Sequence, residues 1–169
     1  VDSIKREESL LKNLKDAVVW YKVGLQLFTA HGKRAVDLVH RHGGKVFLDL
    51  KLHDIPQTVA HAVHEARRLG VEAVSIHLMG GPEMISAAAS VSPRPELWGV
   101  TVLTSMAEKN VKIFHPGARI PALVKSLAKL GWLHGADATI CSAREVAYLR
   151  KQFPHLDMKF VTPGIRPRG

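Results

Sequence analysis

Cysteine is almost absent from this sequence, since Cys141 is the only one among 169 residues. A single cysteine excludes an intrachain disulfide and a cysteine-rich zinc site, which favours a reducing setting. No stretch approaches the ~18 consecutive apolar residues of a membrane span. The first eight residues are polar and mixed in charge, so they lack the apolar core of a signal peptide. We therefore expect a cytoplasmic protein with no membrane partner.

Acidic residues are the minority charge, with 15 Asp and Glu against 24 Lys and Arg and a formal net charge of +9. Such an excess is typical of a polyanion-binding protein, or of a solvated basic surface with one anion-binding pocket. The basic residues are scattered and form no run of five, so we expect no nucleic-acid partner. Apolar residues make up 46% and charged residues 23%, which is ordinary for a globular protein. The length fits one domain over residues 1–169.

Short apolar runs alternate with helical patterns along the whole chain. The runs predict six strands, at residues 17–24, 45–51, 73–77, 97–103, 136–141 and 158–162. Helices are predicted at residues 1–16, 33–42, 56–70, 83–90, 119–130 and after the capping box of Ser142 and Glu145. Strict alternation of strand and helix implies a parallel sheet covered by helices. Both a doubly wound sheet and a (β/α)8 TIM barrel fit, and the barrel would lack its first and last strands here.

Charged side chains gather where the predicted strands end. Asp49 and Lys51 are two residues apart, so on a strand both point to one face, and Asp54 follows within a turn. Lys22 ends the preceding strand in the same way. Parallel α/β folds bind their ligands at this edge, and we expect Thr104, Ser105 and Arg166 to lie there too. The alternative is purely structural, with Asp49 and Lys51 as a buried ion pair and Arg166 as a solvated loop residue.

Three other features have simpler interpretations than the chemistry they first suggest. His61 and His64 fall on the polar face of their helix, with no acidic residue at a metal-binding spacing, so we predict no metal site. Gly80 and Gly81 favour a tight turn over a phosphate cradle. Cys141, at a strand end, is interpreted as a core residue and not as a nucleophile.

One motif resembles a known enzyme family, the orotidine 5′-phosphate decarboxylases of bacterial type. The motif is Asp49-Leu50-Lys51-Leu52-His53-Asp54-Ile55-Pro56-Gln57-Thr58, with an Asp-x-Lys-x-x-Asp-Ile-Pro core. Supporting pieces follow in the family's order: Tyr21-Lys22-Val23-Gly24, Ile76-His77 with Gly80-Gly81, 100–105, Cys141-Ser142-Ala143 and 161–167. The resemblance implies a (β/α)8 homodimer that converts orotidine monophosphate to uridine monophosphate and CO2 without metal or organic cofactor. It places the reaction in the de novo synthesis of pyrimidine nucleotides.

The resemblance also implies a role for each motif residue. Lys51 would donate a proton to C6 of the pyrimidine, and Asp49 would face the departing carboxylate. Lys22 would contact Asp49 and the ribose. Asp54 would also be catalytic and would reach, with Thr58, into the neighbouring subunit's site. The other implied substrate contacts are Ile55, Thr104 at the pyrimidine ring, and Pro163 and Arg166 at the phosphate. The family's first strand with a ribose-binding Asp, its last strand with a Gly-Arg phosphate site, and most of the loop after Arg166 are not in this sequence.

Two other functions remain open. Magnesium-dependent sugar-phosphate decarboxylases and aldolases of the same superfamily share Asp-x-Lys-x-x-Asp, but they carry an acidic residue where this chain has Lys22. Lys22, Ile55-Pro56 and Thr104 argue against that class. The third possibility is a non-catalytic basic barrel that binds nucleotides, whose retention of ligand would depend on low salt.

Overall fold

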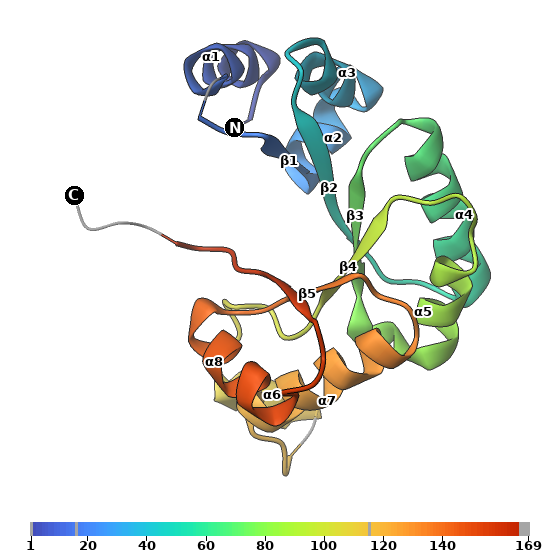
Figure 1. Cartoon of the computed structure of the whole chain (residues 1–169), viewed down its shortest axis with the longest axis vertical. Coiled ribbons are helices and arrows are strands. Elements are labelled where there is room, and N and C mark those ends of the chain that lie inside the picture. The colour runs from blue at the N-terminus through green and yellow to red at the C-terminus, as the bar shows by residue number, and fades with distance from the viewer. Residues whose placement is uncertain (1, 16, 115, 166–169) are drawn as a thin grey trace.

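The computed structural model describes residues 2–15, 17–114 and 116–165. Its centre is one sheet of six strands, all parallel and arranged in chain order from β1 to β6 (Figure 1). The strands are β1 Trp20–Gly24, β2 Lys45–Leu52, β3 Ala73–His77, β4 Glu96–Val100, β5 Ala138–Ile140 and β6 Lys159–Val161. Each lies within or at the bounds of a predicted apolar run, give or take a residue. Sequential order without a reversal excludes the doubly wound alternative, and the curved sheet is a partial barrel.

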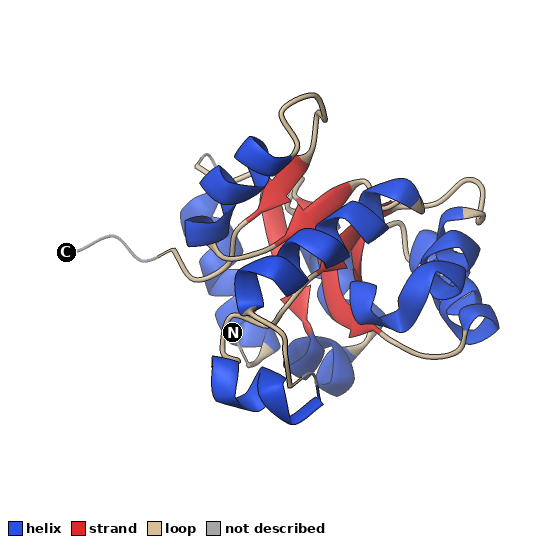
Figure 2. Ribbon diagram, turned by 90° about the horizontal axis from the view of Figure 1, so that it is seen from below, coloured by secondary structure: helices blue, strands red, loops and turns tan. Residues whose placement is uncertain are grey.

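Helices surround the sheet on its outer side (Figure 2). They are α1 Ile4–Leu14, α2 Leu25–His31, α3 Lys33–Arg41, α4 Pro56–Arg68, α5 Gly81–Ala89, α6 Glu108–Phe114, α7 Ile120–Leu133 and α8 Ala143–Gln152. Proline at the start of α4 and the capping box of Ser142 and Glu145 at α8 behave as predicted. Among the described residues, no helix combines the length and apolarity that a membrane crossing needs.

Two helices were not predicted from the sequence. Helix α2 was missed because it follows β1 at once and Gly24 provides no capping side chain. Helix α6 was missed too, in the segment between the predicted strand 97–103 and the predicted helix 119–130, for which no element was predicted. At Gly80 and Gly81 the predicted turn takes the form of the 3-10 helix Leu78–Gly80, which runs directly into α5.

The alternation of side chains along the strands creates two apolar layers. The larger layer lies between sheet and helices and contains outward-facing residues such as Val46 and Leu48. The smaller layer lies inside the curve of the sheet: Phe47, Ala73, Trp98, Val100, Ala138 and Ile140. Because the inner layer belongs to successive strands, it forms a floor beneath their carboxyl ends.

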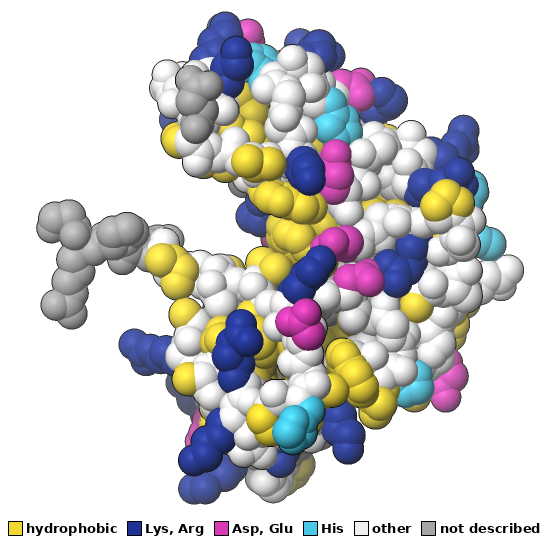
Figure 3. All heavy atoms as spheres, viewed as in Figure 1, with side chains coloured by type: hydrophobic (Ala, Val, Ile, Leu, Met, Phe, Trp, Pro, Cys, Tyr) yellow, Lys and Arg dark blue, Asp and Glu magenta, His cyan; other side chains and the backbone are white. Residues whose placement is uncertain are grey.

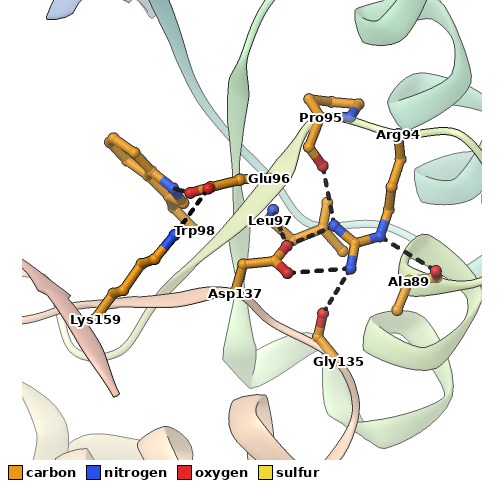
Figure 4. Close-up of polar contacts among 9 residues, drawn as sticks. All are labelled: Ala89, Arg94, Pro95, Glu96, Leu97, Trp98, Gly135, Asp137 and Lys159. Atoms are coloured by element: carbon orange, nitrogen blue, oxygen red, sulfur yellow. Dashed lines mark hydrogen bonds and ion pairs between the residues drawn. The ribbon is translucent and has the colours of Figure 1, made fainter. Parts of the chain in front are cut away.

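The amino ends of the strands are tied together by a salt bridge. Arg94, before β4, pairs with Asp137, before β5, and also donates to the backbone carbonyls of Ala89, Pro95 and Gly135 (Figure 4). Asp137 in turn accepts the backbone N–H of Leu97 at 2.7 Å. These contacts join the segments that lead into β4 and β5 at the end of the sheet opposite the strand carboxyl ends.

Candidate active site

Asp49 lies between two lysines. Its Oδ1 is 2.8 Å from Lys51 Nζ on the same strand, and its Oδ2 is 3.3 Å from Lys22 Nζ on β1. The parallel register of β1 and β2 pairs Lys22 with Phe47 and Gly24 with Asp49. The Lys22 side chain therefore extends toward the carboxyl end of the strands, by two residues, to reach the carboxylate. The predicted proximity of these three side chains is confirmed.

Strand β2 bulges where it carries this pair. Leu48 is paired with Val74 of β3, but the next paired residue of β2, Leu52, lies opposite Ile76. Four steps along β2 therefore match two along β3, and Lys51 takes up the excess with a φ of 52°. The leucines keep the predicted outward direction toward α4. The two charges still share the inner side, but through an irregular strand and not through the regular alternation that predicted them.

The charges around Asp49 outweigh the cost of burying it. The carboxylate is 8% exposed, and this burial alone would raise its pKa. Hydrogen bonding and attraction from Lys51, attraction from Lys22 and a hydrogen bond from Ser75 act in the opposite direction. The net effect lowers the pKa of Asp49 below its ordinary value, so the carboxylate is ionised at neutral pH.

A cavity of about 510 Å³ opens above this cluster, at the carboxyl ends of the strands. The sequence-predicted residues that line it are Lys22, Asp49, Lys51, Thr104, Ser105 and Pro163. Its remaining walls are mostly apolar, including Val100 and Ile140 from the inner layer. On the hollowed face in Figure 3, hydrophobic side chains lie deep and basic and acidic ones lie beside them. With two lysines against one carboxylate and mostly apolar walls, such a cavity suits a small molecule that carries negative charge.

The second motif carboxylate lies elsewhere. Asp54 and Thr58 border a separate depression of about 290 Å³, and Ile55 is 65% exposed beside it. Asp54 accepts the backbone N–H of Ile55 at 2.7 Å, and no ion pair joins it to a lysine within the described residues. Lys51 borders both hollows, so Asp54 lies near it but outside the cavity that Asp49 lines.

Other sequence predictions have mixed outcomes. His61 and His64 are exposed on α4 as expected. Cys141 is 1% exposed in the core, and burial raises the pKa of its thiol to about 12, which agrees with a structural role. Arg166 lies outside the described residues.

Sequence reasoning assigned no role to two polar residues of β3. Ser75 is fully buried and contacts Asp49 and Lys51, although a hydroxyl within an apolar run gives little signal. His77 ends the same strand and stacks on His53, with their ring centroids 5.3 Å apart. Burial, and then the charges of His53 and Lys51, lower the pKa of His77.

Comparison with known proteins shows the family to which this chain belongs. A profile described as "Orotidine 5′-phosphate decarboxylase / HUMPS family" matches residues 1–169. The chain belongs to this family. Orotidine 5′-phosphate decarboxylase from Pelobacter propionicus is 45% identical over 163 residues, covering 91% of this chain and 66% of the relative. The enzyme from Trichlorobacter lovleyi is 41% identical over 177 aligned residues, covering 99% of this chain and 72% of the relative.

A solved decarboxylase supports the partial barrel. The crystal structure of orotidine 5′-phosphate decarboxylase from Lactobacillus acidophilus superposes with a TM-score of 0.87 at 34% identity, covering 99% of this chain and 79% of that one. The chain thus spans about two thirds to four fifths of the length of these relatives. The predicted family, an orotidine 5′-phosphate decarboxylase of pyrimidine biosynthesis with a TIM-barrel fold, is confirmed at the level of sequence and fold.

Proposed function

We propose that this site decarboxylates orotidine 5′-phosphate to uridine 5′-phosphate and CO2. The observation that carries the proposal is the buried carboxylate of Asp49, with an ammonium on each of its oxygens at the mouth of the barrel. Loss of CO2 from the substrate leaves negative charge at C6 of the pyrimidine ring, with little delocalisation to disperse it. An ammonium fixed beside C6 stabilises that charge and can then supply the proton that completes the product.

Lys51 is proposed as this proton donor and Asp49 as its partner. A carboxylate placed against the substrate carboxylate disfavours the bound ground state, and this repulsion is relieved as CO2 departs. Asp49 also holds Lys51 at 2.8 Å, so the ammonium is oriented before the substrate binds. Lys22 is proposed to hold the other oxygen of Asp49 and to reach the ribose.

The rest of the cavity is proposed to bind the nucleotide away from the reacting carbon. Thr104 borders the apolar wall and is assigned to the pyrimidine ring, and Pro163 to the phosphate end. Arg166, as a guanidinium, would suit a phosphate there. Binding energy from the phosphate can hold the ring in its reactive position.

Replacement of one lysine tests the proposal. We expect Lys51→Ala to lower decarboxylation by roughly a thousandfold or more, equivalent to about 4 kcal/mol of transition-state stabilisation. Binding of uridine monophosphate, measured by calorimetry, should change far less, because the ring and phosphate contacts remain. Lys45→Ala is the matched control, since Lys45 begins the same strand and lies over the Trp20 ring outside the cavity. Near-normal turnover by a folded Lys51→Ala protein would leave Lys51 as a structural ion-pair partner.

We further propose a cytoplasmic homodimer whose active sites are completed across the interface. The support is that Asp54 and Thr58 do not line the cavity but a second depression, which Lys51 also borders, next to the exposed Ile55. These residues are therefore available to a second copy. Inactive Lys51→Ala chains mixed with inactive Asp54→Ala chains should recover up to about a quarter of the activity, because hybrid dimers hold one intact site of two. No recovery between subunits shown to exchange would contradict the shared site.

A further inference from the structure

The hydroxyl of Ser75 bridges the two halves of the proposed catalytic pair. It donates to Asp49 Oδ1 at 3.0 Å and accepts the backbone N–H of Lys51 at 2.8 Å. Ser75 lies in the middle of β3 and is 0% exposed, so water does not compete for either bond. A serine hydroxyl has one hydrogen to donate and lone pairs to accept with, and both capacities are directed at neighbouring catalytic residues.

The bulge in β2 explains why this hydroxyl is needed. Between Leu48 and Leu52 the regular pairing with β3 is interrupted. Lys51 has a φ of 52°, a backbone conformation that residues other than glycine rarely adopt. A side-chain hydroxyl from β3 takes the place of a ladder partner for the Lys51 N–H. Without it, that N–H would be buried with one partner fewer.

The same hydroxyl also constrains the carboxylate. Lys51 Nζ and Ser75 Oγ both approach Oδ1 of Asp49, while Lys22 approaches Oδ2. Three strands therefore hold one carboxylate, and rotation of its plane would break contacts on β1, β2 and β3 together. Of these contacts, the one from Ser75 is neutral and fully buried. It fixes the orientation of the Asp49 carboxylate, whereas the two lysines balance its negative charge.

We propose that Ser75 is a positioning residue for decarboxylation, which sets the Lys51 backbone and the Asp49 carboxylate in their reactive relationship. The inference rests on the proposed function. It does not require Ser75 to touch the substrate, and Ser75 does not line the cavity. Its loss should therefore reduce the chemical step and leave the binding of the nucleotide nearly intact.

Steady-state kinetics of Ser75→Ala test the inference against a matched control. We expect kcat to fall ten- to a hundredfold while KM changes less than threefold, and Ser75→Thr, which keeps the hydroxyl, to restore most of kcat. Thr101→Val is the control, because Thr101 is also fully buried but donates to the backbone carbonyl of Ile140, away from the pair. A drop in kcat equal to that of Thr101→Val, or no rescue by Ser75→Thr in a folded protein, would overturn the proposal.

A second measurement does not depend on turnover. In Ser75→Ala the pKa of Asp49, followed by carbon NMR of its carboxylate, should rise toward that of an ordinary aspartate, with Lys22 and Lys51 still facing it. Ser75→Cys is the substitute if Ser75→Ala does not fold. If the parent chain fails to decarboxylate, the proposed function fails while this titration still decides the role of Ser75. An unchanged Asp49 titration would overturn that role.

Discussion

Lys22 contacts Asp49 across the first pair of strands, with 3.3 Å between its Nζ and the carboxylate Oδ2. The space for this contact comes from a missing side chain. Gly24 is the register partner of Asp49, and a Cβ built on it would lie 2.7 Å from Lys22 Nζ. Glycine at position 24 therefore leaves room for the ammonium, a reason that differs from the conformational freedom for which glycine is usually selected.

Gly24→Ala should disturb this contact without disturbing the fold. The atom displaced is the end of a flexible side chain, and the φ of −90° at Gly24 is open to alanine. We expect kcat to fall several-fold while the thermal unfolding midpoint stays within about 2 °C, which corresponds to at most about 1 kcal/mol. Gly117→Ala, where a Cβ would meet nothing within 4 Å, should leave both quantities unchanged. An unaltered kcat in Gly24→Ala would mean that the position of Lys22 does not matter to the reaction.

Metal removal should leave turnover unchanged. The ammonium of Lys22 stands 3.3 Å from Asp49, and a divalent cation bound to that carboxylate would be repelled by both neighbouring lysines. Assays after exhaustive treatment with a chelator, compared with assays supplemented with magnesium, measure this directly. Loss of activity that magnesium restores would favour the sugar-phosphate class instead.

Arg94 should contribute strongly to stability, although it is far from the chemistry. Arg94→Met leaves the Asp137 carboxylate and three backbone carbonyls without the guanidinium that they share. Because the Arg94 side chain is only 20% exposed, we expect a loss of about 3 kcal/mol in the free energy of unfolding, measured with denaturant. Arg68→Met, which removes an exposed pair with Glu65, should have no measurable effect. Equal effects in both variants would contradict a buried structural role for Arg94.

The sequence predicted the parts of the site that depend on strand order and missed those that depend on irregular backbone. Parallel strands in sequence bring Lys22 and Asp49 to one edge whatever the details of the loops, so this proximity could be expected from the apolar runs alone. The bulge at Lys51 and the contact of Ser75 arise from pairing between distant segments, which leaves no periodic trace in either strand. The position of Asp54 outside the cavity could not be predicted for a related reason, since spacing along a strand says nothing about the direction of the chain after it ends.

Glu7 gives the fold a pH dependence that is independent of the active site. It is 4% exposed on α1, and no hydrogen-bond partner for its Oε2 is found within the part of the chain that the structure describes. Burial raises the pKa of this carboxyl to about 7 from an ordinary value of 4.5. Between pH 4.5 and about 7, the folded state therefore keeps a proton on Glu7 that the unfolded state has already released. The contribution of the protonated Glu7 to the free energy of unfolding is fully present below pH 4.5. It declines as the pH rises and is lost above about pH 7.

Glu7→Gln should remove this dependence by supplying a permanently neutral side chain of the same size. We expect the variant to match the parent near pH 4.5 and to exceed it by about 1–3 kcal/mol in free energy of unfolding at pH 8. Denaturant titrations at several pH values measure the difference. Glu8→Gln is the control on the same helix, because Glu8 pairs with Lys12 and its pKa is lowered, so this variant should gain nothing at pH 8. A stability difference between Glu7→Gln and the parent that does not grow with pH would show that Glu7 is ionised within the fold.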